Sequence, residues 1–147
     1  MIDFEYYTPT KIFFGRGAQA RAGALVREFG GTKVLLHYSG TAVRLGLLED
    51  VKAQLDELGI GYAELGGVQP NPRLAKVYEG IALCREQGVD FILAIGGGSV
   101  IDSAKAIGVG AADDGDVKDF YLRKRVPTRS LPVATILTFA AAGSEMS

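Results

Sequence analysis

Short apolar segments recur along the chain, and each is ended by glycine or by polar residues. The segment at 91–95 (Phe-Ile-Leu-Ala-Ile) is apolar throughout and ends at a glycine. Continuous apolar runs of this length are typical of strands that are buried on both faces of a parallel sheet. The pattern predicts strands at residues 11–14, 33–37, 61–65, 91–95 and 131–137.

Apolar residues at helical spacing fill the intervals between these strands. Ala22, Leu25, Val26 and Phe29 share one face of a predicted helix. The same spacing predicts helices near residues 47–58, 74–84 and 100–108, and Asn71 and Pro72 suit the start of the second of these three. Strands that alternate with helices predict an α/β fold, namely a Rossmann-like open and mostly parallel sheet with helices on both faces.

Residues 113–129 follow neither pattern. The acidic residues come first, and the basic ones follow: Asp113, Asp114, Asp116 and Asp119, then Arg123, Lys124, Arg125 and Arg129. The plainer interpretation is a solvated loop, and the alternative is a lid or a contact for a partner.

Composition excludes several classes of protein. Of the 147 residues, 48% are hydrophobic and 22% are charged, as in an ordinary globular domain. The formal net charge of −1 argues against a nucleic-acid partner. No apolar run approaches the ~20 residues of a membrane span. The N-terminus also lacks the layout of a signal peptide, so we expect a cytoplasmic protein with no membrane partner.

Histidine and cysteine each occur once, as His37 and Cys84. A single cysteine allows no internal disulfide, and a single histidine allows no histidine cluster for a catalytic metal. His37 ends a predicted strand, where we expect it to pack or to cap rather than to catalyse. Cys84 lies on the core face of a predicted helix, where we expect an inert thiol. No catalytic residue is assigned.

Glycine and hydroxyl residues follow the predicted strands. In an open parallel sheet, ligands bind at the carboxyl ends of the strands, so these turns are expected to converge on one edge. The most informative turn is 96–99, Gly-Gly-Gly-Ser, because it joins a buried strand to a predicted helix. Glycines let a phosphate approach the backbone, and the N–H groups of the helix then point at it. The spacing is not that of a P-loop, and Ile101 stands where G-x-G-x-x-G needs its third glycine. Its place in the chain nevertheless predicts phosphate binding.

Asp102 and Lys105 lie three residues apart, and therefore on one face of the predicted helix. One interpretation is an exposed ion pair. The other is that Asp102 accepts hydrogen bonds from a sugar or amide of the ligand, since an acid beside a phosphate would repel it.

Several motifs together resemble one known family. Residues 96–105 (Gly-Gly-Gly-Ser-Val-Ile-Asp-Ser-Ala-Lys) resemble the signature of the iron-containing (group III) alcohol dehydrogenases. Residues 8–15 resemble their N-terminal strand, Asn71-Pro72 their Asn-Pro turn, and residues 138–145 their loop ending in Gly-Ser-Glu. The order and spacing agree along the whole chain, and the butanol-dehydrogenase-like branch looks closest.

The resemblance implies that residues 1–147 are the NAD(P)-binding domain of a two-domain, dehydroquinate-synthase-like enzyme. The full-length enzyme would interconvert a primary alcohol and an aldehyde, while this fragment alone would be inactive. A helical C-terminal domain, absent from this chain, would hold a divalent iron or zinc ion, and no residue here matches a metal ligand. The implied partners are a nicotinamide dinucleotide, a small alcohol or aldehyde, and further copies of the chain in a homodimer or larger assembly.

The resemblance also implies which residues contact the cofactor. Gly97, Gly98 and Ser99 would hold the pyrophosphate, and Asp102 would contact the nicotinamide ribose or amide. The other contacts would come from Thr138, Phe139 and Ser147 along the cofactor, from Asn71 near the nicotinamide, and from Ser39, Gly40 and Thr41 beneath the adenine ribose.

The choice of cofactor depends on one position. NAD-preferring members tend to carry an aspartate where Ser39 stands here, bonded to the ribose 2′-OH. Without that acid nothing repels a 2′-phosphate, so we expect NADP(H) to be preferred over NAD(H). Two alternatives remain open: a glycerol-dehydrogenase or dehydroquinate-synthase-like relative, and a non-catalytic nucleotide-binding module. Because the second domain is absent, we also expect the chain to self-associate through the apolar rim of its sheet.

Overall fold

The computed structural model describes residues 3–5, 7–68 and 74–146. Its strands are β1 (Lys33–Tyr38), β2 (Gly61–Leu65), β3 (Phe91–Gly96) and β4 (Val133–Leu137). The α-helices are α1 (Ala22–Glu28), α2 (Gly40–Arg44), α3 (Leu47–Glu57), α4 (Leu74–Gln87), α5 (Gly98–Ala112) and α6 (Lys118–Tyr121). Two short 3₁₀ helices, η1 (Ala18–Arg21) and η2 (Ser144–Met146), lie near the ends of the described chain.

The strands form one parallel sheet in the order β2-β1-β3-β4. The chain runs outward from β1 to β2 on one side, and then crosses β1 to reach β3 on the other. The carboxyl ends of β1 and β3 therefore lie side by side where the strand order reverses. Ligands of open α/β sheets bind at such a switch point.

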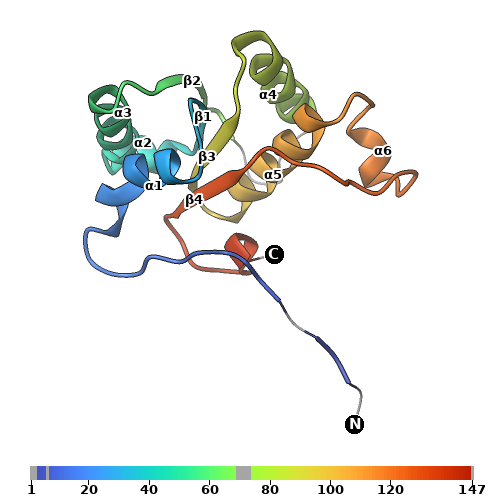
Figure 1. Cartoon of the computed structure of the whole chain (residues 1–147), viewed down its shortest axis with the longest axis horizontal. Coiled ribbons are helices and arrows are strands. Elements are labelled where there is room, and N and C mark those ends of the chain that lie inside the picture. The colour runs from blue at the N-terminus through green and yellow to red at the C-terminus, as the bar shows by residue number, and fades with distance from the viewer. Residues whose placement is uncertain (1–2, 6, 69–73, 147) are drawn as a thin grey trace.

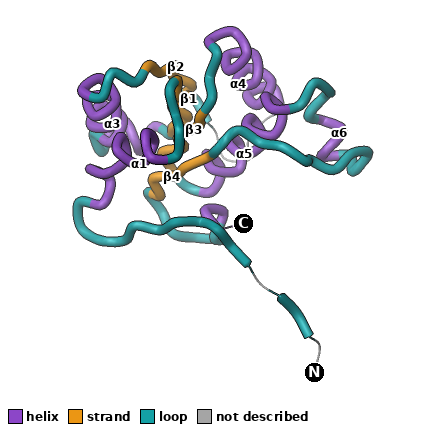
Figure 2. Tube along the Cα trace, in the orientation of Figure 1, coloured by secondary structure: helices purple, strands orange, loops and turns teal. Residues whose placement is uncertain are grey.

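Helices cover both faces of the sheet, as the sequence predicted (Figures 1 and 2). Successive residues of a strand point to opposite faces, and the strands are apolar on both. On one face, Leu35 and Ile92 pack with residues of α4 and α5. On the other, Leu36 and Leu93 pack with residues of α1, α2 and α3. Two hydrophobic layers therefore hold the sheet from both faces. The ends of the strands lie outside these layers, where they can form a site.

Glycines bring α4 and α5 into close contact. A Cβ atom built on Gly80 of α4 would lie 2.4 Å from Cδ1 of Ile107 on α5. In the reverse direction, a Cβ on Gly110 of α5 would lie 2.3 Å from Cδ1 of Ile81 on α4. No real Cβ fits at such distances, so both glycines are required for this packing.

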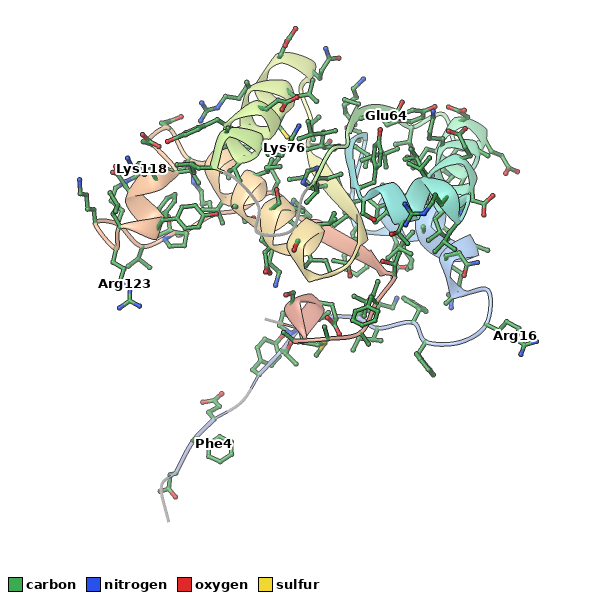
Figure 3. The ribbon with its side chains drawn as sticks, turned by 180° about the vertical axis from the view of Figure 1, so that it is seen from behind. Phe4, Arg16, Glu64, Lys76, Lys118 and Arg123 are labelled. Atoms are coloured by element: carbon green, nitrogen blue, oxygen red, sulfur yellow. The ribbon has the colours of Figure 1, made fainter. Side chains whose placement is uncertain are left out.

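The predicted strand at 11–14 is wrong. Residues 7–14 form neither a helix nor a strand, and Phe14 is 100% exposed. A strand needs a partner strand, and no described segment pairs with this one. The N-terminal segment instead runs away from the body of the molecule, and Phe4 lies far out on it (Figure 3). The predicted helix start at Asn71-Pro72 lies outside the described residues.

Residues 113–129 are more ordered than a solvated loop. They contain α6, and Arg125 ties the segment together by donating to the carboxylate of Asp113 at 2.8 Å and to the carbonyl of Asp116 at 3.1 Å. The Arg125 guanidinium also lies 4.6 Å from the centre of the Phe120 ring. The acidic and basic halves of this segment thus pair with each other. Within the part of the chain that the structure describes, no helix is long and apolar enough to cross a membrane.

Candidate nucleotide site

Three strand ends meet at one edge of the sheet. The N–H of Ser39, just past β1, donates to the carbonyl of Ile95 in β3 at 3.1 Å. The N–H of Thr138, just past β4, donates to the carbonyl of Gly96 at 3.0 Å. The turns after β1, β3 and β4 are thereby fixed next to one another, which confirms the predicted convergence for these strands.

The glycine turn (residues 96–99) occupies the centre of this edge. Gly96 must be glycine, because a Cβ there would lie 2.6 Å from Cγ2 of Val100 and 3.2 Å from Oγ of Ser39. Gly97 is the N-cap of α5, and no side chain caps the helix there. A Cβ at Gly97 would meet nothing within 4 Å. Open space therefore lies beside Gly97 at the N-terminus of α5, where the first-turn N–H groups favour an anion.

The β1 turn (residues 39–41) borders the glycine turn on one side. The Ser39 hydroxyl caps α2 by accepting from the N–H of Ala42 at 3.3 Å. Thr41, in the first turn of α2, accepts a hydrogen bond from Nη2 of Arg44 at 2.9 Å. Ser39, Gly40 and Thr41 are thus brought to the site, and Arg44 joins them. Sequence reasoning missed Arg44, although its place one helical turn after Thr41 is a visible signal.

The C-terminal wall (residues 138–146) borders the glycine turn on the other side. Ser144 lies over Gly98, since a Cβ on that glycine would be 3.2 Å from the Ser144 hydroxyl. Lys105 of α5 donates to the backbone carbonyl of Ser144 and so anchors the wall. Phe139, at the start of the wall, is 72% exposed. The ion pair that is one interpretation of Asp102 and Lys105 does not form among the described residues.

Asp102 instead faces an apolar groove of about 370 Å³ between α5 and the segment that holds α6. Lys105 lines the same groove, and its apolar side is formed by Ala106, Val109, Val117, Phe120, Tyr121 and Pro127. The pKa of the Tyr121 hydroxyl is raised by burial and, to a smaller extent, by the negative charge of Asp102. Asp102 is exposed on α5, one turn beyond the glycine turn.

His37 and Cys84 are buried, as the sequence predicted. Nδ1 of His37 lies 2.8 Å from the carbonyl of Leu65, and Nε2 lies 2.9 Å from the hydroxyl of Ser103. Burial lowers the pKa of His37 and so favours the neutral ring. Burial also raises the pKa of the Cys84 thiol to about 12. Neither side chain lines the site.

Two further residues that the resemblance assigned, Asn71 and Ser147, lie outside the described residues. The described residues also contain no cluster of histidine, cysteine, aspartate and glutamate that could hold a metal ion. By contrast, the open backbone at Gly97 and the bordering hydroxyls suit a dinucleotide. The geometry of the described residues therefore suits a nucleotide, and they offer no set of metal ligands.

A glycine turn at the switch point of a parallel sheet is typical of nucleotide-binding α/β domains. Residues 9–147 match the family described as iron-containing alcohol dehydrogenase, and the chain belongs to that family. It is 46% identical over 147 residues to probable NADH-dependent butanol dehydrogenase 1 of Bacillus subtilis, covering 100% of this chain and 38% of the relative. It is 35% identical over 150 residues to the NADPH-dependent aldehyde reductase YqhD of Escherichia coli, covering 99% of this chain and 38% of that protein.

The fold also matches that of a solved structure. The crystal structure of NADH-dependent butanol dehydrogenase A from Thermotoga maritima superposes with a TM-score of 0.94 at 39% identity. That match covers 98% of this chain and 36% of the other. The α/β architecture predicted from the sequence is thereby confirmed, and the chain spans somewhat more than a third of the length of its relatives.

Proposed function

We propose that this chain is the nucleotide-binding part of an NAD(P)-dependent alcohol dehydrogenase that interconverts a primary alcohol and an aldehyde in the cytoplasm. The observation that carries the proposal is the open glycine turn at the switch point, bordered by hydroxyl groups. The family and the names of the relatives support the reaction class. In this proposal, the divalent metal and most of the alcohol-binding groups are supplied by the part of the full-length enzyme that this chain does not cover.

In this proposal, each turn at the carboxyl edge of the sheet contacts a different part of the dinucleotide. The first-turn N–H groups of α5 at Gly98 and Ser99 bind the pyrophosphate, whose charge the helix dipole also favours. Gly97 leaves room for it, because nothing lies within 4 Å of its Cβ position. Asp102 accepts hydrogen bonds from the nicotinamide ribose or amide, which are neutral. The nicotinamide supplies hydride transfer when it is bound.

The bordering turns orient the two ends of the dinucleotide. Thr138 and Phe139, at the start of the C-terminal wall, contact the dinucleotide along its length. We assign a further contact of this kind to Ser147 and one near the nicotinamide to Asn71. The β1 turn lies beneath the adenine ribose. Since Ser39 stands in place of an aspartate, we propose that NADP(H) is preferred over NAD(H). Relatives named for each cofactor match the chain, so this preference rests on the residues of the turn.

Calorimetric titration of the chain with NADP⁺ and NAD⁺ tests the proposal. Gly97→Val places a branched side chain in the open space, and the backbone there (φ −93°, ψ −167°) suits valine. We expect this variant to lose at least tenfold in affinity for both dinucleotides, with an unchanged urea midpoint. Ala82→Val, on an exposed position of α4, is the matched control and should bind as the parent does. Unimpaired binding by Gly97→Val would refute the site.

We also propose that the chain associates with further copies of itself. The N-terminal segment exposes Phe4 by 87%, Ile12 by 61% and Phe14 by 100%. Apolar side chains exposed in this number drive association. Light scattering should therefore show a dimer or larger species, and a monodisperse monomer at high concentration would contradict the proposal.

A further inference from the structure

Arg44 lies at the border of the candidate site without being assigned to it. It is the last residue of α2, one turn after Thr41. Its Nη2 donates to the Thr41 hydroxyl at 2.9 Å. Its Nη1 lies 3.7 Å from where a Cβ on Gly40 would be. The guanidinium therefore folds back over the β1 turn instead of extending into solvent.

This cation has no anionic partner within the described chain. Lys11, Lys52, Lys76 and Arg125 each pair with a carboxylate there, whereas no salt bridge includes Arg44. Arg27 and Arg85 donate to backbone carbonyls instead. Arg44 bonds only to a neutral hydroxyl among the described side chains, and its charge remains uncompensated at the surface of the turn.

The arrangement of donors suits a phosphate. The Thr41 hydroxyl accepts from Arg44, so its own hydrogen is free to donate to an anion. The guanidinium keeps other N–H groups in the planar fork that binds phosphate oxygens in pairs. Gly40 carries no side chain that would block the approach. A bare ribose diol is read by a carboxylate, and the β1 turn offers none.

The position of the turn identifies which phosphate this would be. β1 is the hydrogen-bonded neighbour of β3, whose glycine turn holds the pyrophosphate in the proposed function. In dinucleotide-binding sheets, the residue that reads the adenine ribose follows a strand beside the one that carries the glycine turn, and an arginine nearby accommodates a 2′-phosphate. Arg44 and Thr41 meet this description.

We infer that Arg44, together with Thr41, binds the 2′-phosphate of NADP(H), which makes Arg44 a residue that determines cofactor specificity. The inference rests on the proposed nucleotide site, and it adds the contact that selects between the two cofactors. The phosphate contact is charge-assisted, so it is stronger than the hydroxyl contact that NAD(H) would make at the same place.

Titration of Arg44→Gln with NADP⁺ and NAD⁺ tests the inference. We expect affinity for NADP⁺ to fall at least tenfold and affinity for NAD⁺ to change less than twofold. Arg44→Lys keeps the charge without the planar fork and should lie between the parent and Arg44→Gln. Arg123→Gln, at an exposed position two residues after α6, is the control for a general loss of positive charge and should change neither affinity. Urea midpoints should agree among all four proteins.

The outcomes separate the inference from the proposed function. Equal loss of both dinucleotides in Arg44→Gln, or equal affinities in the parent, would overturn the role of Arg44 and leave the nucleotide site standing. Failure of the parent to bind either dinucleotide would refute the proposed function, and Arg44 with it. As a further arm, 2′-AMP should displace NADP⁺ at lower concentration than inorganic phosphate does. Equal displacement would mean a general anion site and would also overturn the assignment.

Discussion

Removal of the Ser103 hydroxyl should destabilise the fold, because it leaves a buried nitrogen without its partner. A carbonyl only accepts hydrogen bonds, so the 2.8 Å contact of His37 with Leu65 requires the ring proton on Nδ1. Nε2 is then an acceptor, and the Ser103 hydroxyl donates to it at 2.9 Å. Both side chains are essentially inaccessible, at 0% and 1% exposure. In Ser103→Ala no water replaces the missing donor unless the core opens.

The expected cost follows from that burial. A buried acceptor left unsatisfied costs about 1–3 kcal/mol. In a domain of this size, each kcal/mol lowers the melting temperature by roughly 2–4 °C. Ser103→Ala should therefore melt roughly 2–12 °C below the parent at pH 8.

The effect should also depend on pH. Burial is the main cause of the lowered pKa of His37, and the carbonyl of Leu65 partly opposes it. Of the nearby charges on α4, Lys76 lowers the pKa and Glu79 raises it. The unfolded chain takes up the proton near pH 6.5 and the native chain only at a lower pH, so the parent loses stability as pH falls below about 6.5. The loss is at most about 1.4 kcal/mol per pH unit. Ser103→Ala removes a donor that favours the neutral ring, so its deficit should shrink at low pH.

Urea unfolding followed by circular dichroism at pH 8.0 and 5.5 measures both effects. Ser130→Ala is the control, because that residue is exposed and its hydroxyl bonds, among the described residues, only to the carbonyl of Leu131, at 2.8 Å. A deficit for Ser103→Ala below about 0.5 kcal/mol at pH 8.0 would refute the argument, since it lies under the usual cost of an unsatisfied buried acceptor. A deficit that grows toward pH 5.5 would refute the assigned tautomer.

Three other expectations follow from the packing. Gly80→Val should lower the free energy of unfolding in urea by about 1–3 kcal/mol, because the new side chain clashes with Ile107. The control Ala82→Val, on the same helix, should lower it by less than about 1 kcal/mol. Equal losses in the two variants would contradict the close contact of α4 with α5. Arg123, after α6, has a left-handed backbone (φ 55°), which is strained for any residue but glycine. Arg123→Gly should therefore raise the free energy of unfolding by about 0.5–1 kcal/mol in the same assay, and a decrease would contradict this strain. The buried Cys84 thiol, with its pKa raised to about 12, should react with a disulfide reagent at pH 8 only after unfolding; rapid reaction of the native chain would contradict its burial.

The core of the fold could be predicted from the sequence because its signal is local. The strands at 33–37, 61–65 and 91–95 and the helices that follow them are marked by apolar spacing, and the structure confirms them. The segment at 11–14 has the same local pattern and forms no strand. Its outcome depends on a partner strand, which spacing within the segment does not encode. The local pattern therefore identifies a segment that could be a strand, but pairing with another strand in the folded protein decides whether one forms.

In the candidate site, too, features set by local sequence could be predicted, and features set by tertiary contact could not. The glycine turn could be placed because it follows the most buried strand, and strand ends converge in any parallel sheet. The His37–Ser103 bond could not, since its residues are 66 positions apart. The short helix α2 was also missed, although Ser39 is a recognisable N-cap. The spacing of Thr41 and Arg44, one helical turn apart, indicates a contact only once α2 is assigned.

The unequal burial of β3 and β4 gives the two sides of the site different mobility. β3 is buried along its whole length and is paired on both edges. β4 is partly exposed throughout and pairs with β3 alone among the described strands. Amide hydrogens of β3 should exchange only through global unfolding, and those of β4 through smaller and more frequent openings. The glycine turn is thus carried by the slowest-exchanging strand and Thr138 by a faster one. The part of a bound dinucleotide near Thr138 should therefore dissociate first, while its pyrophosphate is still bound to the glycine turn.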